Sequence, residues 1–446
     1  MKRLLTLLLA ALLCCLPVSC THMDSPADTP SDEIKADAMK DPYGVSAEEA
    51  VILQDSGEVV LYWDTLERSA REEDFADYFE KYYGGTVTVR FCPPDDDAVT
   101  LTRDQAAGMA PDLFRLTESY WPRAALRGLT MPRSQLTKLG VVGLDHPVLT
   151  QYRGMTEAAY TYGGDCFAVS VCSVSPVMVA FNAEMFRGYA VASPADYYVE
   201  GEWNNTAFLR CCNELSRTDP NGHTVLGAVP GDLTWFLRAA DADPMTIRGT
   251  TLTVDLLSSN ALQALSFCRT LLQSSAVGTD EEAFLSGRAG MLCATAEDLI
   301  PRLSRCAFEW DVVPFPYGDG NETGARPGTF VGWAVPYGAK NVQGAVNFVI
   351  ARQLFLNFHY GVEQGALWNA GYGVYSEAQR RRILDATAMV RPALFPDFGD
   401  LPARTEAFWT DVGGSEPIYD VASRYTDVIR AAITEEMTAT QQGVSP

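Results

Sequence analysis

Hydrophobic and polar residues follow two different periods along this chain, and each change of period predicts a new element. Residues 58–63 (EVVLYW) and 86–91 (TVTVRF) are rich in β-branched and aromatic residues, and the second run alternates like a half-buried strand. Between the two runs, four aromatic residues recur at helical spacing, namely Phe75, Tyr78, Phe79 and Tyr82. Strand, helix and strand in this order predict a βαβ unit and an α/β fold with a mostly parallel sheet.

Further helical stripes recur at 205–217, 259–273 and 343–358. Residues 110–114 (APDLF) predict a short strand that opens onto a helix. No internal repeat interrupts this order, and residues 438–446 lose the pattern, so we expect a frayed tail there.

The N-terminus has a different pattern. Lys2 and Arg3 precede a run of apolar residues from 4 to 16, which is too short to span a bilayer and predicts a secretory signal peptide over 1–19. The run ends at Val18-Ser19-Cys20, which resembles the lipobox of bacterial lipoproteins, although Pro17 departs from the usual leucine. An ordinary cleaved signal with a chance cysteine is the alternative. The resemblance implies that Cys20 is acylated, by palmitate or a similar chain, at the outer face of the cell membrane.

Residues 20–57 are rich in Asp, Ser, Pro and Ala, so they predict a flexible tether. Of all 446 residues 47% are hydrophobic, which is enough for two lobes with large cores. The net charge of −23 argues against nucleic acid and against direct binding to anionic lipid, since both need basic patches. We therefore expect a monomer that meets the membrane through its lipid anchor alone.

Eight cysteines follow Cys20, and an exported protein could pair them. No CxxC spacing occurs, and several lie in apolar stripes, as Cys212 and Cys268 do. Buried thiols that act as small hydrophobic residues are the favoured interpretation.

Sequence motifs for catalysis are absent. The four histidines lie far apart, so a metal site is not expected, and no nucleotide-binding or nucleophile motif calls for a cofactor. A glycosidase needs only two facing carboxylates, which Asp64, Asp112 and Glu118 could supply at strand ends. A surface-anchored glycoside-processing enzyme therefore stays open as the alternative to a binding protein.

Six segments, in order, resemble the extracellular solute-binding proteins of ABC importers, the family that includes maltodextrin-binding proteins. They are EVVLYWDT with GGTVTVRF, GMAPDLFRLTESY, SVSPVMVAFNAEMF, GEWNNTAFLRCCNELSRTDPNG, EEAFLSGRAGMLCA, and WDVVPFPYG with GTFVGWAVPYGAKNVQGAVNFV. The resemblance covers residues 59–433 and implies a non-enzymatic, periplasmic-binding-protein-like clamp. Its two lobes close around a small solute, here a carbohydrate or oligosaccharide, and deliver it to the permease.

The resemblance also implies where the chain passes between lobes, namely near 173–175, 330–332 and 409–419. The first lobe would take 58–174 and about 282–330. The second would take 175–281 and about 331–408, and residues 409–437 would form a last crossing with helices.

Matching motif positions imply a ligand-binding set with no catalytic member. The set consists of Asp64, Thr65, Glu118, Ser119, Tyr120, Ser175, Asp232, Trp235, Glu297, Gly332, Trp333, Trp368, Asn369 and Tyr372. Trp333, beside a crossing, and Trp368, in a Gly-rich loop, are the expected stacking platforms, whereas Trp63, Trp203 and Trp310 are expected in the core. The matched loops hold no cluster of Arg or Lys, which argues against a phosphorylated ligand.

Overall fold

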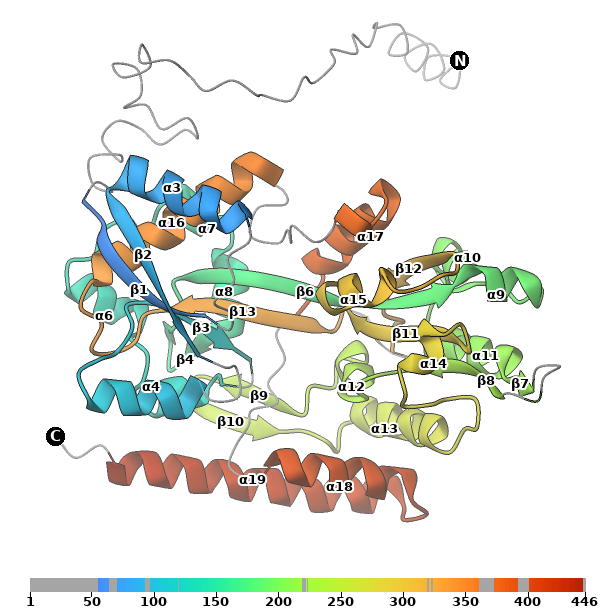
Figure 1. Cartoon of the computed structure of the whole chain (residues 1–446). Helices are drawn as coiled ribbons and strands as arrows, with labels where there is room; N and C mark the ends of the chain where they lie inside the picture. Colours follow the sequence, from blue (N-terminus) through green and yellow to red (C-terminus); the bar gives the residue numbers. More distant parts are fainter. Residues whose placement is uncertain are drawn as a thin grey trace, which may run out of the picture. The chain divides into compact units, whose positions relative to one another are not determined.

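The structure is a computed structural model that describes residues 55–63, 70–92, 97–118, 120–218, 222, 224–318, 321, 324–360, 373–391 and 401–443. The helices and strands among these described residues lie within residues 48–446, which form one compact unit (Figure 1). The strands are β1 (Gly57–Trp63), β2 (Gly85–Phe91), β3 (Phe114–Thr117), β4 (Thr161–Tyr162), β5 (Asp165–Cys166), β6 (Ser170–Asn182), β7 (Arg217–Thr218), β8 (Thr224–Val229), β9 (Met245–Arg248), β10 (Thr251–Val254), β11 (Ala289–Thr295), β12 (Trp310–Pro314) and β13 (Gly328–Ala334). The helices are α3 (Ala70–Tyr83), α4 (Asp97–Ala106), α5 (Arg123–Leu126), α6 (Arg133–Lys138), α7 (Pro147–Thr150), α8 (Arg153–Tyr160), α9 (Ala183–Gly188), α10 (Pro194–Glu200), α11 (Asn205–Leu215), α12 (Thr234–Ala239), α13 (Ser259–Leu272), α14 (Glu282–Leu285), α15 (Ala296–Leu303), α16 (Val342–Tyr360), α17 (Glu377–Ala388), α18 (Leu401–Gly413) and α19 (Ile418–Gly443).

The predicted βαβ unit is confirmed, because β1 and β2 pair in parallel on either side of α3. The aromatic face of α3 packs against α16, with the rings of Phe75 and Phe348 at 5.2 Å between centroids. Gly84 ends the helix in a left-handed conformation (φ 58°), which a residue without Cβ adopts without strain. The chain can then turn back at once into β2.

Strand β6 is the longest strand and changes partners along its length. Its residues 170–176 pair with β13, and its residues 177–182 pair with β11 and β12. We call β6 and β13 the crossing strands, the elements on the β3 side the first lobe, and the elements on the β11 side the second lobe. The change of partners comes directly after the predicted crossing at 173–175.

Two predictions about the sheet need correction. Strands β11, β12 and β13 all pair antiparallel with β6, so the sheet around the crossing is not mostly parallel. The pairings also place β11 and β12 in the second lobe, whereas α16 packs on α3 and β1 of the first lobe. The segment 282–330 was expected in the first lobe, but its strands β11 and β12 lie in the second. The segment 331–360 was expected in the second lobe, but α16 lies in the first. At these crossings the chain enters the lobe opposite to the expected one.

Side-chain alternation along β6 gives the second lobe a core on each face of its sheet. Val177, Val179 and Phe181 enter one apolar cluster with α11 and α13, while Met178 and Ala180 enter another with α14 and α15. This period of two is what a strand covered on both faces requires.

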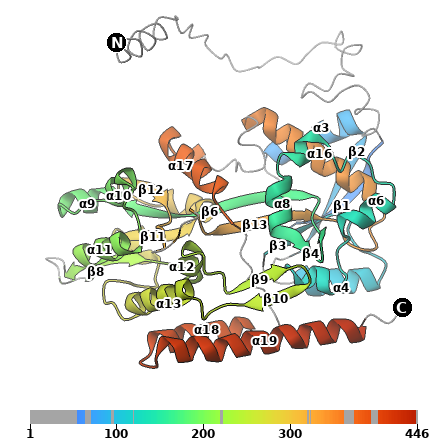
Figure 2. The same ribbon diagram turned by 180° about the vertical axis from the view of Figure 1, so that it is seen from behind.

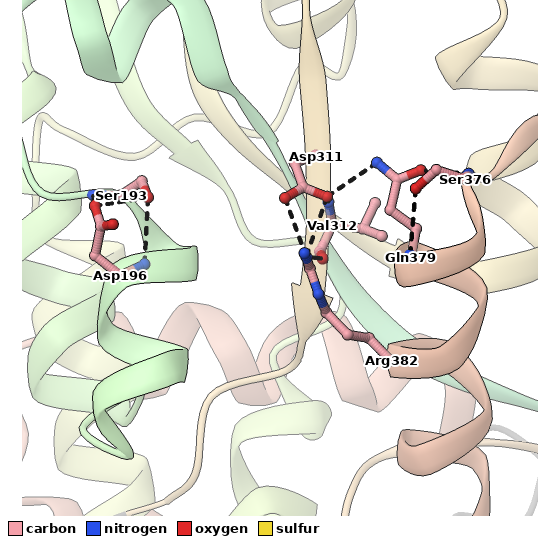
Figure 3. Close-up of polar contacts among 7 residues, drawn as sticks. All are labelled: Ser193, Asp196, Asp311, Val312, Ser376, Gln379 and Arg382. Carbon is pink, nitrogen blue, oxygen red and sulfur yellow. Dashed lines mark hydrogen bonds and ion pairs between the residues drawn. The ribbon is translucent and has the colours of Figure 1, made fainter. Parts of the chain in front are cut away.

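Helix α17 covers the second cluster and is fastened to the edge strand β12. Figure 3 shows the Arg382 guanidinium donating to both carboxylate oxygens of Asp311, at 3.0 and 3.1 Å, while Gln379 donates to the same carboxylate. Ser376 and Gln379 also form the capping box that begins the helix. The Ser193 and Asp196 pair in the same view caps α10 in the same way.

Helices α18 and α19 pack beside α13, and α19 also contacts β10 (Figures 1 and 2). The expected frayed tail at 438–446 begins too early, because α19 continues to Gly443. The third crossing, expected at 409–419, is the turn between α18 and α19, and both helices contribute to the same second-lobe cluster.

No helix among the described residues has the length and apolar character needed to cross a bilayer. The eight cysteines after Cys20, all among the described residues, form no disulfide with one another, and all but Cys306 are buried. Cys211, Cys212, Cys268 and Cys293 pack within the apolar cluster that α11 and α13 share.

Candidate functional site

The crossing strands present two chemically different faces. Val174 and Phe330 point into an apolar cluster with Trp121 and Tyr160, each at most 2% exposed; we call this side the apolar face. The alternate residues of the same strands are Ser173, Ser175, Thr329 and Val331, and we call their side the polar face. Thr329 is exposed and Ser173 is half-buried, so the polar face is the side on which a ligand can reach the pivot of the fold.

The polar face brings two predicted site residues together. Ser175 Oγ accepts a hydrogen bond of 3.1 Å from the backbone N–H of Glu297, the second residue of α15 on the second lobe. Glu297 is exposed, so its carboxylate stands at the pivot beside the polar face. Thr295 fixes the start of α15 by accepting from the Asp298 N–H and donating to its carboxylate, which orients Glu297.

Three residues that the sequence analysis did not assign to the site lie at its first-lobe end. The guanidinium carbons of Arg115 and Arg352 lie 5.2 and 5.6 Å from the ring centroid of Trp63, within cation–π range. Trp63 ends β1 and is half-buried rather than part of the closed core. The sequence signal for Arg115 was the alternation of FRLT, which directs Phe114 and Leu116 inward and Arg115 outward.

Cys172 connects this basic group to Glu297. Burial raises the pKa of the Cys172 thiol, Arg115 and Arg352 lower it, and Glu297 raises it. All three charged groups therefore lie within electrostatic reach of the Cys172 thiol. The site thus offers an aromatic ring, guanidinium donors, the exposed Thr329 hydroxyl and a carboxylate, which are the groups that bind a polyhydroxylated ligand.

The structure does not support Trp333 as a stacking platform. Its side chain is 2% exposed and packs between Trp63 and Phe348, with both ring centroids 5.6 Å away. Gly332 leaves no room for a ligand either, because a Cβ there would lie 2.8 Å from the Tyr160 ring. Trp63 covers Trp333, so Trp63 is the member of the pair that faces outward.

Glu118 and Tyr120 lie on the apolar side instead. Tyr120 is 5% exposed and belongs to the cluster that contains Tyr160. Burial is the main cause that raises the pKa of Tyr160, and the Glu118 carboxylate adds to it. Glu118 also accepts from both terminal nitrogens of Arg238 at 3.5 Å. These placements do not bring Glu118 and Tyr120 to Ser175 and Glu297.

Asp232 and Trp235 lie at the start of α12 in the second lobe, Asp232 two residues before the helix and Trp235 in its first turn. The Asp232 carboxylate accepts from the Thr234 N–H and hydroxyl at 2.8 and 2.7 Å, and Trp235 packs edge-on against Phe315. Asp232 is exposed and Trp235 half-buried, so both are accessible. Trp203 lies in the core as expected, with its indole N–H donating to the Pro314 carbonyl at 2.8 Å.

Several predicted residues lie outside the described ones. They are Asp64, Thr65, Ser119, Trp368, Asn369, Tyr372 and the lipidation site Cys20. Among the residues that are described, no group of three or more His, Cys, Asp and Glu side chains could hold a metal ion.

Comparison with solved structures matches nearly the whole described chain. An ABC substrate-binding protein from Listeria monocytogenes, in complex with cycloalternan, has a TM-score of 0.64 at 18% identity, over 85% of this chain and 100% of that one. The fold is that of the ABC-importer solute-binding proteins. The predicted fold class, a two-lobe periplasmic-binding-protein-like α/β fold, is thereby confirmed.

Two further structures share this fold. The galacto-N-biose-/lacto-N-biose I-binding protein of the Bifidobacterium longum ABC transporter, in complex with lacto-N-biose, has a TM-score of 0.62 at 13% identity, over 85% and 97% of the two chains. UgpB from Mycobacterium tuberculosis, in complex with glycerophosphocholine, has a TM-score of 0.60 at 16% identity, over 85% and 99%. No protein-family model and no curated protein matches the sequence.

Proposed function

We propose that this protein is the substrate-binding lipoprotein of an ABC importer, which captures a carbohydrate at the polar face of its crossing strands and delivers it to the permease. The observation that carries the proposal is the polar face itself. There the Glu297 N–H bonds Ser175 on the second-lobe side, and Trp63, half-buried beside Arg115, lies on the first-lobe side. A solute bound between them contacts both lobes, and such contacts are what drive closure of a clamp.

A carbohydrate suits this set of groups best. Aromatic rings stack on the apolar faces of sugars, and carboxylates, hydroxyls and guanidinium groups bond sugar hydroxyls. The structures of similar fold from Listeria monocytogenes and Bifidobacterium longum hold saccharides, which supports the same ligand class here. UgpB holds glycerophosphocholine, so a phosphodiester is the competing ligand class to test. Arg115 and Arg352 make this test necessary, because guanidinium groups also bind phosphate.

The alternative, a glycoside-processing enzyme, has little support from the described carboxylates. Asp112 is 3% exposed and accepts from three backbone N–H groups, those of Val60, Lys340 and Asn341, at 2.7 to 2.9 Å. Glu118 pairs with Arg238 on the apolar side of the crossing strands. Both carboxylates thus serve the packing of the fold, which favours a receptor.

A thermal-shift screen tests the proposal. We expect saturable stabilisation by an oligosaccharide such as maltotetraose, cycloalternan or lacto-N-biose, with no release of reducing sugar from the same samples. Release of reducing sugar would establish the enzyme instead. Stabilisation by glycerophosphocholine but by no sugar would contradict the carbohydrate.

The anchor has its own test. If Cys20 is acylated, Cys20→Ala should release the protein into the medium or leave its precursor uncleaved, as membrane fractionation would measure. Cys14→Ala is the matched control, because Cys14 lies inside the predicted signal peptide and should leave membrane retention unchanged. Retention of the Cys20→Ala protein would contradict the lipoprotein.

A further inference from the structure

The C-terminal helix α19 connects the two lobes. Its Val421, Tyr425 and Ile429 pack into the core of the second lobe, which fixes the helix there. Further along the same helix, the Glu436 carboxylate is held by the first lobe. It accepts a two-pronged hydrogen bond from Arg127, whose Nη2 lies 3.0 Å from Oε2, and Arg123 Nε lies 3.4 Å from Oε1.

The carboxylate of this ion pair is shielded from water. The Glu436 side chain is 7% exposed, and those of Arg123 and Arg127 are 18% and 36% exposed. Leu126, between the two arginines, packs against the apolar cluster of the second lobe. A charge-assisted, two-pronged bond of this kind holds its partners in one geometry, so it restrains the lobes as well as the side chains.

The hairpin of β9 and β10 makes a second bridge. Met245 and Val254 belong to the second-lobe core, while Ile247 packs against the first-lobe cluster that contains Tyr160. At the tip, the Gly163 N–H donates to the Gly249 carbonyl at 2.9 Å, and the Tyr162 hydroxyl donates to the Thr250 carbonyl at 3.2 Å.

A third bridge lies closest to the crossing strands. Arg238 of the second lobe donates to Glu118 of the first, and also to the Gly328 carbonyl at 2.8 Å, where β13 begins. Each bridge meets the first lobe at or beside the cluster on the apolar face: Arg123 precedes Ala124 of the cluster, Ile247 packs against it, and Glu118 lies two residues before its Tyr120. The bond from Glu297 to Ser175 belongs to the polar face, but it lies on the pivot itself.

We propose that α19 is a latch: the bond of Glu436 to Arg123 and Arg127 keeps the polar face open, and closure on a ligand must loosen it. The crossing strands act as a pivot, so closing the lobes on one side separates them on the other. A ligand can shift the equilibrium between open and closed lobes only by the difference in its affinity for the two states. The free energy of the latch therefore sets how large this difference must be for the lobes to close. This inference rests on the proposed clamp function, from which it takes the direction of closure.

The test uses X-ray scattering from the ligand-free chain of residues 21–446, which keeps every described element. We expect Glu436→Gln to lower the radius of gyration, because the unlatched lobes sample the closed state. Glu435→Gln is the matched control: it removes the same charge from the neighbouring, exposed position and should scatter like the wild type.

Arg127→Gln protects the test against misfolding, because it leaves Glu436 paired with Arg123 and removes only the more exposed arginine. We expect a smaller fall in the radius of gyration from this variant. An unchanged or larger radius of gyration in a folded Glu436→Gln protein, or in Arg127→Gln if the first variant does not fold, would overturn the latch. No ligand enters the measurement, so the result stands apart from success or failure of the sugar screen.

Discussion

The two faces of the crossing strands come from alternate residues of the same strands, β6 and β13, yet they have opposite chemistry. On the apolar face, Val174 and Phe330 are closed in by aromatic rings, and three bridges tie the lobes together. On the polar face, Thr329 is exposed and Ser175 bonds the first turn of α15. One face holds the pivot in place, and the other leaves polar groups available.

The face on which a residue lies therefore distinguishes a buried residue from a candidate binding residue better than its residue type does. Trp63 and Trp333 are neighbours with similar rings, but Trp333 lies beneath and Trp63 lies above. The comparison predicts that substitutions on the buried side change stability and that substitutions on the polar side change affinity.

The largest expected effect is that of Trp333→Ala. The ring is 2% exposed between Trp63 and Phe348, so its loss leaves a cavity and should cost about 3–5 kcal/mol of unfolding free energy. Urea unfolding measures this cost.

Trp63→Ala is the partner variant in this test. Its ring is half-buried, so we expect a smaller loss of stability and a loss of about 1–3 kcal/mol in affinity for the sugar that the screen selects. Normal affinity in Trp63→Ala, or normal stability in Trp333→Ala, would break the distinction between the two rings.

Much of the fold could be predicted from periodicity. Strands β1 and β2 and helices α3, α11, α13 and α16 lie where the patterns indicated, because their burial follows from residues close in sequence. Ser175 and Glu297 were each candidates from the family resemblance, but neither the resemblance nor periodicity indicated that they pair, since they lie 122 residues apart.

Other features could not be predicted, because they depend on contacts distant in sequence. Trp333 is covered by Trp63 from β1, and no local pattern reveals which of two tryptophans lies on top. The placement of β11, β12 and α16 in the lobes opposite to those expected has the same origin. The positions of the crossings along the sequence do not fix which lobe the chain enters after each one. The motif match for Glu118 likewise could not anticipate Arg238, 120 residues away.

A second, smaller effect concerns the apolar side, where a pocket of about 320 Å³ separates α8 from β9. Burial raises the pKa of Asp243, which lines it, from 3.8 to about 6, while Arg238 and Arg391 lower that pKa and Asp241 raises it. Because the folded pKa lies above the unfolded one, the contribution to stability is complete below about pH 4 and is lost as the pH rises through about 6.

Asp243→Asn should remove this dependence. Between about pH 4 and pH 7, the unfolding free energy of the wild type should fall by about 2 kcal/mol relative to the variant, as urea titrations at both pH values would measure. Glu157→Gln is the control, since Glu157 lines the same pocket but is exposed. A parallel pH dependence in the wild type and Asp243→Asn would show that the burial of Asp243 does not matter for stability.

The smallest expected effect tests the polar face directly. Glu297→Gln keeps the backbone N–H that bonds Ser175, so α15 should hold its place and the melting temperature should stay unchanged. The side chain loses its charge, and a hydrogen bond from a sugar hydroxyl to a carboxylate is stronger than one to an amide. We expect about a tenfold weaker affinity for the selected sugar, close to 1.4 kcal/mol, measured by calorimetry. Glu118→Gln removes the same charge on the opposite face, where it loosens the bridge to Arg238, so it should not weaken binding. An equal loss of affinity in both variants would contradict the assignment of ligand binding to the polar face and of lobe packing to the apolar face.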